Sequence, residues 1–350
     1  MLFRSWSILQ VIKKRRPALV LLENVRNLAG PRHEHEWEVI IKTLREQKYL
    51  VSEVPGIFSP HLLPPSLGGR PQVRERVFIV AIRDDSSKPS ERVLTNPVVD
   101  NTPVAQWDPS SWILSKHLPL QRGNKINGCE LSDSEIYWID AWDEFVTSMW
   151  ELRNGVRLPG FPLWGDDWRL VSDLRIPKST PQWKAQHLRK NAEFYTEYKD
   201  FIDRWTRKWK FYSDKFPPSR RKLEWQAQDT PSLWETVMHF RPSGIRAKKP
   251  TYLPALVAIT QTSIIGPKGR RLSPREAARL QGLPDWFDFG DQPDSATYRQ
   301  LGNGVSVGAV WHVMRQAVLQ NEQILKKSAP NLVKSVLGAP ENPDEALKNH

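Results

Sequence analysis

The sequence predicts an α/β protein in which a large inserted domain interrupts a sheet domain. In the stretch 18–25, five apolar residues in a row follow a basic amphipathic segment and Pro17, and the run stops at Glu23 and Asn24. Such a run is typical of a strand buried on both faces of a parallel sheet. Residues 77–82 form a second apolar run. After Asp85 the composition changes to Trp, Pro and charged residues, and ordered patterns return only near Gly269, which indicates the insert.

Helix and strand patterns alternate in the first part of the chain. In residues 2–16 apolar side chains recur at three- to four-residue spacing, which predicts an amphipathic helix. Its last turn is basic and complements the negative end of the helix dipole. The patterns that follow predict a helix at 34–47, a strand at 49–54, a Pro- and Gly-rich loop at 55–70 and a strand at 77–82.

Two polar elements stand at the ends of the predicted strands. Glu23 closes the first apolar run, and ligands of open α/β sheets bind beyond the carboxyl ends of the strands. This carboxylate is therefore either a capping or salt-bridging group or a substrate contact. Gln72, Arg74 and Arg76 point to one side of the segment that enters the next strand. This polar row with two positive charges would suit an anionic or carbonyl-rich partner. An equally good explanation is that the two arginines form surface salt bridges.

The bulk composition favours nucleic acid as a partner. The 350 residues carry a formal charge of +12, although a basic protein without such a partner is the alternative. Cys129 is the only cysteine, which excludes a disulfide framework and fits a reducing cytoplasm. The sequence predicts neither a membrane span nor a signal peptide. His33 and His35 have no Cys or carboxylate cluster at ligand spacing, so we expect no metal site.

The insert, expected at 86–262, carries the basic residues that fit a DNA backbone. Helical patterns occur at 132–152 and 193–211, and the aromatic stripe of the second segment is typical of a helix core. Between 184 and 222 about a dozen Lys and Arg stand against about five acids. Residues 241–250 predict a Gly-containing basic loop that could follow a groove. The candidate DNA-contact residues are Arg220, Arg221, Arg241, Arg246, Lys248 and Lys249.

A short, well-marked helix follows the insert. Ser273 is its predicted N-cap, Pro274 occupies the first helical position, Glu276 completes a capping box and Gly282 ends the helix. Farther along, a Gly-Asn-Gly turn leads into a closing helix from 307 to about 325. The remaining polar, Pro-containing tail is predicted to be disordered.

Four short motifs occur in the order found in DNA cytosine-5 methyltransferases. They are Glu23-Asn24-Val25, Gln72-x-Arg74-x-Arg76, the run from Arg271 to Pro284, and Gly302-Asn303-x-Val305. The third motif is the most specific, and a large variable stretch separates it from the second, as in the family. The chain therefore resembles this family over about residues 2–83 and 264–319.

The resemblance implies a partial Rossmann-like methyltransferase sheet plus an inserted α+β or irregular target recognition domain. Four parts are expected: the C-terminal part of the catalytic domain at 1–85, the target recognition domain at 86–262, a return to the catalytic domain at 263–326, and the tail at 327–350. Double-stranded DNA is the implied partner.

The resemblance also implies roles for single residues. Glu23 would hydrogen-bond the ring nitrogen N3 of a flipped cytosine, and Arg76, with Arg74, would hold the cytosine O2 and the nearby backbone. The S-adenosylmethionine pocket would be closed by Asn303, Val305, Gly302 and Gly304, with the two glycines in conformations that a side chain forbids. Arg275 and Glu276 would be structural.

The family's glycine-rich cofactor loop and its Pro-Cys nucleophile loop both precede the first of these motifs, and only about two dozen residues precede Val25. We therefore expect an N-terminally truncated methyltransferase with an incomplete cofactor pocket and no activity alone. Cys129 has no preceding Pro and is expected to be an incidental thiol. The alternatives are a DNA-recognition subunit whose partner chain carries the missing motifs, a non-catalytic DNA-binding remnant, and an unrelated nucleic-acid-binding protein.

Overall fold

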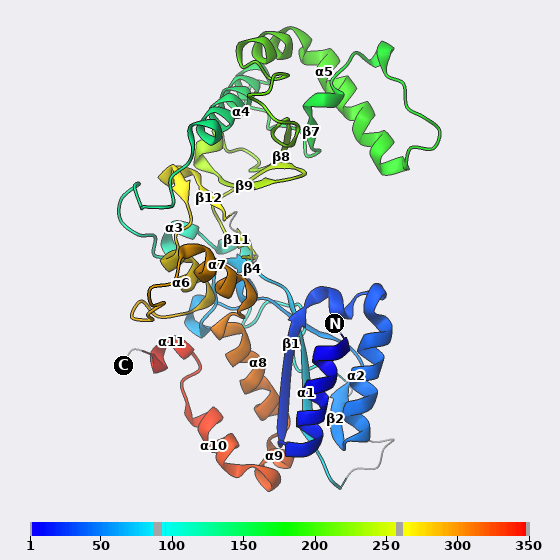
Figure 1. Ribbon diagram of the computed structural model, residues 1–350, viewed down its shortest axis with the longest axis vertical. Helices are drawn as coiled ribbons and strands as arrows, with labels where there is room; N and C mark the ends of the chain where they lie inside the picture. The colour runs from blue at the N-terminus through cyan, green and yellow to red at the C-terminus, as the bar shows by residue number, and fades with distance from the viewer. Residues whose placement is uncertain (1, 87–92, 95, 257–261, 348–350) are drawn as a thin grey trace.

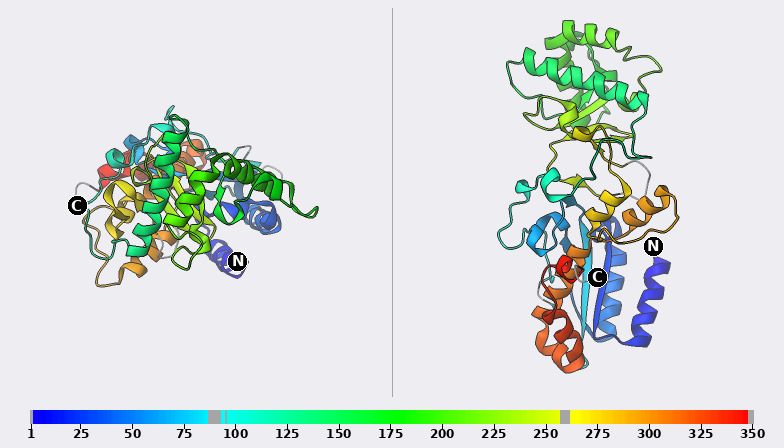
Figure 2. Two further views of the ribbon diagram at one scale, coloured as in Figure 1. Left: turned by 90° about the horizontal axis from the view of Figure 1, so that it is seen from above. Right: turned by 90° about the vertical axis from the view of Figure 1, so that its left-hand side faces the viewer.

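The computed structural model describes residues 2–86, 93–94, 96–256 and 262–347. The molecule is elongated and consists of a lower lobe, an upper lobe and a junction between them (Figure 1). The first part of the chain and the C-terminal helices form the lower lobe, and the middle of the chain forms the upper lobe (Figure 2).

A five-stranded sheet lies at the centre of the lower lobe. Its central strand, β5 (Arg76–Arg83), pairs antiparallel with β1 (Leu19–Val25) along one edge. Along its other edge β5 pairs antiparallel with β2 (Tyr49–Ser52) and with β3 (Gly56–Phe58). β6 (Val93–Leu94) adds to β2 in parallel.

Helices cover both faces of this sheet. The odd-numbered apolar residues of β5 pack with α1 (Leu2–Arg15) and α2 (Glu34–Glu46), and the even-numbered ones pack against α8 (Val307–Gln320). Figure 1 shows the resulting three layers, with α9 (Glu322–Ser328) and α10 (Pro330–Gly338) beside α8. The helices predicted at 2–16 and 34–47 are confirmed.

The prediction that the first apolar run is buried on both faces of a parallel sheet is wrong. In the described part of the chain, β1 is an edge strand that pairs only with β5, and the pairing is antiparallel. Val20 is buried, but Leu21 and Leu22 are only half-buried. Strands with buried residues on both faces are β5 and its neighbour β2. An apolar run reports burial, whereas the direction of pairing depends on neighbours that are distant in sequence.

The upper lobe is built on a six-stranded sheet and two long helices. α4 (Asp133–Leu152) starts at Ser132 with a full capping box. α5 (Gln182–Lys208) starts before the helix predicted at 193–211. The sequence pattern did not indicate this earlier start, because the first turns of α5 are mostly polar and carry no apolar period. The aromatic stripe of α5 packs into the core of this lobe, which confirms its structural interpretation. The strand order is β13 (Arg270–Arg271), β12 (Ile264–Ile265), β9 (Val237–Arg241), β10 (Gly244–Lys248), β8 (Lys222–Gln226), β7 (Leu163–Trp164).

The junction contains the helix that the sequence marked most clearly. α6 (Pro274–Gln281) has the predicted Ser273 cap and capping box, and Gly282 ends it with φ of 83°. Its buried residues share a core with residues of 114–118 and 298–301. The remaining junction elements are α3 (Leu114–His117), α7 (Asp294–Asn303) and the parallel pair β4 (Gln72–Val73) and β11 (Leu253–Pro254).

Two parts of the chain differ from the expected organisation. β6 and the buried residues Val98 and Val99 lie in the lower lobe, although the insert was expected from residue 86, and β12 and β13 join the upper sheet. The expected closing helix breaks at Asn321. The prediction of a disordered tail is wrong for α10 and for α11 (Pro343–Ala346), since sparse apolar residues of α10 pack into the lower core.

Candidate functional site

Glu23 and Arg76 form an ion pair where β1 ends and β5 begins. The antiparallel register places Val25 opposite Arg76 and Glu23 opposite Phe78. The Nε of Arg76 lies 2.8 Å from Oε1 of Glu23, and the two side chains are 14% and 27% exposed. Both groups are thus partly shielded from water but still reachable by a ligand.

The surroundings of this pair shift the proton affinity of its carboxyl. Burial raises the pKa of Glu23, and the positive charges of Arg76 and Arg74 only partly oppose it. Burial likewise lowers the pKa of Arg76, which the Glu23 charge opposes. A carboxyl that keeps its proton to a higher pH than usual can donate a hydrogen bond to a ring nitrogen.

A cavity of about 200 Å³ adjoins the ion pair along β1. Glu23 and Asn24 contribute the polar part of its lining, and the rest is mainly apolar. Its other lining residues are Ile8, Leu9, Leu21, Leu22, Leu28, Ile40, Val77 and Ile79. Perturbed titratable groups beside an apolar hollow are a common arrangement of functional sites.

Arg74 plays a different part from Arg76. Its side chain is buried, and its guanidinium donates to the carbonyl oxygens of Leu256 at 2.7 Å and Gly302 at 2.8 Å, and to that of Gly304. Burial lowers the pKa of Arg74 to about 10. Arg74 therefore positions the 302–304 turn and the end of the insert against β4. The sequence could not indicate this, because the acceptors lie 182 or more residues away.

The 302–305 segment adopts ordinary backbone conformations. Gly302 lies inside α7, Gly304 has φ of −70°, and neither glycine is in the left-handed region. The prediction that these glycines allow conformations forbidden to other residues is therefore wrong. Their contribution to the structure is made by their carbonyl oxygens, which accept hydrogen bonds from Arg74. Asn303 is exposed and Val305 is half-buried.

Residues 241–250 form the turn and second strand of a hairpin rather than a basic loop. β9 and β10 pair antiparallel, and Gly244 opens β10 with φ of 132°. The prediction missed the hairpin because charged residues alternate with only two apolar ones in β10.

The six predicted DNA-contact residues are all engaged within the upper lobe and the junction. Arg241 and Arg246 share one carboxylate, that of Glu224. Arg220 stacks on Phe240, with 4.6 Å between the guanidinium carbon and the ring centroid. The other three contacts are Arg221 with Asp166, Lys249 with Asp229, and Lys248 over the Tyr252 ring.

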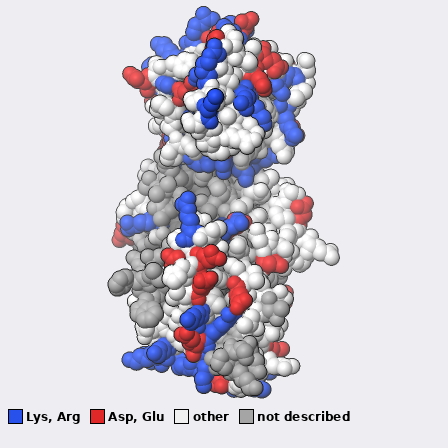
Figure 3. Space-filling view, turned by 90° about the vertical axis from the view of Figure 1, so that its right-hand side faces the viewer, with Lys and Arg blue, Asp and Glu red and all other residues white. Residues whose placement is uncertain are grey.

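Charge is divided unevenly over the surface. On the face in Figure 3, Lys and Arg are spread over the upper lobe and along its underside together with several acids, and the lower lobe carries a central cluster of Asp and Glu with Lys and Arg around it and at its foot. A groove of about 820 Å³ over α2 has four glutamates and two basic residues in its lining, which consists of Glu34, Glu38, Glu46, Glu53, Lys42, Arg45, Trp37 and Ile41. A polyanion therefore meets favourable charge on the upper lobe and unfavourable charge at α2.

Cys129 is fully buried in this structure. Its Sγ lies 4.0 Å from the Tyr298 hydroxyl, and burial raises the pKa of the thiol. A nucleophilic cysteine needs an accessible, low-pKa thiolate, so the geometry supports the interpretation of Cys129 as an incidental thiol.

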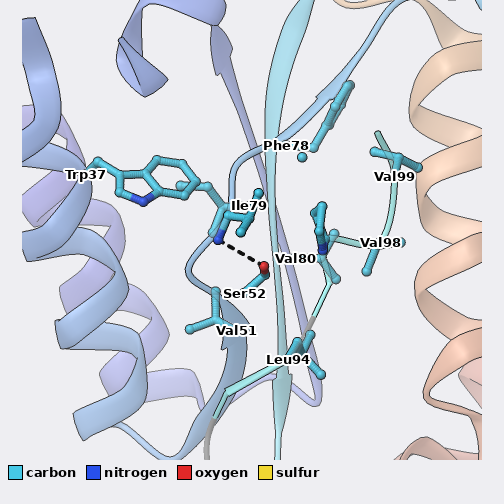
Figure 4. A pocket seen from close by; sticks show the side chains of 12 residues that line it. Trp37, Val51, Ser52, Phe78, Ile79, Val80, Leu94, Val98 and Val99 are labelled. Atoms are coloured by element: carbon cyan, nitrogen blue, oxygen red, sulfur yellow. Dashed lines mark hydrogen bonds between the residues drawn. The ribbon is translucent and has the colours of Figure 1, made fainter. Parts of the chain in front are cut away.

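Other candidate sites are weaker. Within the described ranges, no three His, Cys, Asp or Glu side chains are grouped as a metal site requires. A closed space of about 10 Å³ between β5, β2 and the 97–99 segment has a mainly apolar lining and no charged side chain (Figure 4). No helix in the described part of the chain has the length and apolar character of a membrane span.

Comparison with known proteins identifies the class. The family model described as "C-5 cytosine-specific DNA methylase" matches residues 3–318. The "Type II methyltransferase M.AluI" of Cellulosimicrobium cellulans is 44% identical over 92% of this chain and 75% of its own length. The "Type II methyltransferase M.HgiCI" of Herpetosiphon aurantiacus is 27% identical, over 87% of this chain and 73% of its own. The chain belongs to the C-5 cytosine-specific DNA methylase family.

Solved structures show weaker similarity. The S. pombe Dnmt2 methyltransferase aligns over 91% of this chain and 72% of its own, with 15% identity and a TM-score of 0.40. A putative DNA modification methyltransferase encoded within an E. coli prophage aligns over 89% and 72%, with 16% identity and a TM-score of 0.39.

Proposed function

We propose that this chain recognises duplex DNA and holds a flipped cytosine as part of a type II restriction-modification methyltransferase. The observation that carries the proposal is the Glu23–Arg76 pair beside the cavity along β1. Membership of the family and the 44% identity to a protein named as a type II methyltransferase support it. The partial Rossmann-like sheet, the target recognition domain with its boundaries, and a cytoplasmic location are parts of the same proposal.

The proposed chemistry of this chain concerns the cytosine ring. A protonated Glu23 donates to N3, and Arg76 donates to O2, so that electron density is drawn from C6 towards the ring nitrogen. C6 then accepts a nucleophile more easily, which activates C5. The base must leave the helix, because the reacting atoms are inaccessible in a stacked duplex.

The residues expected to bind the family's methyl donor, S-adenosylmethionine, do not fit it by themselves. The Gly302 and Gly304 carbonyls are already bound by Arg74, and Asn303 offers one exposed amide. The donor carries an adenine, a ribose and an amino-acid group, which need more polar partners than one amide provides. The proposal therefore assigns to this chain the recognition of duplex DNA and the cytosine contacts, and no contact to the methyl donor.

We further propose that the purified chain transfers no methyl groups, because its single thiol is buried at Cys129. The test is transfer of labelled methyl groups from S-adenosylmethionine to DNA, with and without a polypeptide carrying a family glycine loop and Pro-Cys loop. We expect turnover only in the mixture. Turnover by the chain alone would disprove the proposal of inactivity.

The role of Glu23 is tested in the active mixture. Glu23→Gln keeps the shape but removes the acid, so we expect the rate to fall by about 10²- to 10⁴-fold, the usual contribution of a general acid. Glu75→Gln is the matched control, since Glu75 pairs with Arg26 at the surface in the same segment. Equal rates for the two variants would remove Glu23 from the site.

A second candidate is a DNA-recognition subunit that docks on a catalytic chain. The observation in its favour is the outer edge of β1, which pairs with no strand among the residues that the structure describes, and beside which Ile8 and Val11 of α1 are 46% and 59% exposed. A strand with an unpaired edge is a template for pairing with another chain. Co-purification of the chain with such a partner supports this candidate, and a monomer that does not bind the added polypeptide argues against it.

A further inference from the structure

One face of the upper sheet is polar across three neighbouring strands. In β8, β9 and β10 buried apolar residues alternate with half-buried polar ones, and the apolar set packs against α4 and α5. The polar face is made by Lys222 and Glu224 of β8, His239 and Arg241 of β9, and Arg246 and Lys248 of β10. It lies away from the helices and carries four cations and one carboxylate.

Glu224 joins two arginines across this face. The register places Arg246 directly between Glu224 on β8 and His239 on β9. Its Nε donates to Oε2 of Glu224 at 2.7 Å, and Nη2 of Arg241 donates to the other carboxylate oxygen. Gly244 of β10, which has no side chain, lies opposite Arg241 in this register.

The contact leaves donors of Arg246 available. Only its Nε has an intramolecular acceptor among the residues that the structure describes, and its side chain is 38% exposed. The two terminal nitrogens of a guanidinium can donate together to O6 and N7 of guanine in the major groove. Glu224 fixes the orientation of that fork and lowers the net charge of the two-arginine group to +1.

The neighbouring histidine adds no charge at neutral pH. Burial and the surrounding cations Arg241, Arg246, Arg271 and Lys248 lower the pKa of His239 to about 4. Its Nδ1 lies 3.3 Å from the Ser263 hydroxyl, which orients the ring. Hydrogen bonds therefore fix the side chains around Arg246, and this face is not simply a group of unconnected positive charges.

We propose that Glu224 aims Arg246 at a guanine edge, so that this pair determines part of the DNA sequence the protein recognises. The inference rests on the proposed function, which requires duplex DNA binding. Phosphate contact by Arg246 is the alternative: it would strengthen binding to every sequence equally and carry no sequence information.

The test is enrichment of bound duplexes from a random-sequence pool, followed by sequencing, with the full chain. We expect the wild type to enrich a motif that contains a guanine. Arg246→Gln should lose discrimination at that position by about 5- to 150-fold, the usual range for one bidentate pair, while other positions are unchanged. Because Arg246 is partly exposed, this variant is expected to fold.

Glu224→Gln tests the positioning role. It should weaken the same guanine preference and make the slope of log affinity against log salt steeper by about 0.9, because one more cation can reach phosphate. Glu144→Gln is the charge-matched control: Glu144 lies on α4, on the opposite side of the sheet, and pairs with Lys208 of α5. It should change neither the motif nor the slope.

The outcomes separate the inference from the proposed function. If Arg246→Gln lowers affinity equally for all sequences, or if its guanine preference equals that of the wild type, the inference is overturned and the proposed function stands. If the wild type binds the duplex pool without salt dependence, or does not bind it at all, the proposed function fails and the inference fails with it.

Discussion

The buried ion pair between Arg270 and Glu276 should dominate the stability of the junction. Both side chains are fully buried, and both terminal nitrogens of Arg270 donate to the carboxylate, at 2.8 and 2.9 Å. The carboxylate also accepts from the backbone N–H of Ser273 at 2.9 Å and of Gln121 at 2.7 Å. The Glu276 side chain thus links three parts of the chain by hydrogen bonds: β13, α6 and the segment that precedes the upper lobe.

Glu276→Ala removes the partner of a buried cation and leaves two buried N–H groups unpaired. Breaking a buried pair on one side costs about 3–5 kcal/mol. For a cooperative unfolding of 350 residues, this corresponds to a melting temperature lower by about 4–7 °C. Replacing both partners, as in Arg270→Met with Glu276→Leu, should restore much of the loss because no charge is then left buried.

The effect should depend on pH in a defined direction. Burial alone would raise the pKa of Glu276, but the hydrogen bonds from Arg270, Ser273 and Gln121 outweigh it and hold the pKa below the ordinary 4.5. The unfolded chain therefore takes up the proton first on acidification. The stabilisation is complete above pH about 4.5 and is lost as the pH falls through the lower pKa of the folded state.

The assay is urea unfolding followed by tryptophan fluorescence, at neutral pH and along an acid series. Glu144→Ala, which breaks an exposed pair with Lys208, is the control and should cost no more than about 1 kcal/mol. The reasoning is refuted if Glu276→Ala costs no more than this control, or if the difference between wild type and Glu276→Ala grows as the pH falls below 4.5.

Three further predictions follow from burial and exposure. Because Cys129 is buried, its thiol should react with an aromatic disulfide reagent only as fast as the protein unfolds, and rapid reaction in native buffer would contradict this. Arg74→Ala should lower the free energy of unfolding by at least about 2 kcal/mol, since it leaves buried carbonyls unpaired, and urea unfolding with an unchanged midpoint would show that these bonds contribute nothing. Ile8→Ser with Val11→Ser should weaken co-sedimentation with the polypeptide that carries the glycine and Pro-Cys loops, at a stability change within about 0.5 kcal/mol, and unchanged co-sedimentation would exclude the α1 surface.

Local signals in the sequence determined the parts of the structure that were predicted well. Ser273, Glu276 and Gly282 lie within ten residues, and they fix the start and end of α6 by contacts inside that segment. The helices α1, α2 and α4 and the strand β5 follow in the same way from periodicity and capping. The order of four short motifs was likewise sufficient for the family, which the match over residues 3–318 bears out.

Only the tertiary structure determined which side chains of these segments come into contact. The sequence put Glu23 at a strand end, but the antiparallel register of β1 and β5 brought Arg76 to it. Arg74 and Arg76 were equivalent in the sequence. In the structure Arg74 donates hydrogen bonds to carbonyl oxygens of distant segments, whereas Arg76 pairs with Glu23. The physical reason is that a periodic pattern encodes which face of an element is buried, whereas the charge, pairing and proton affinity of a site depend on groups brought together only when the chain folds.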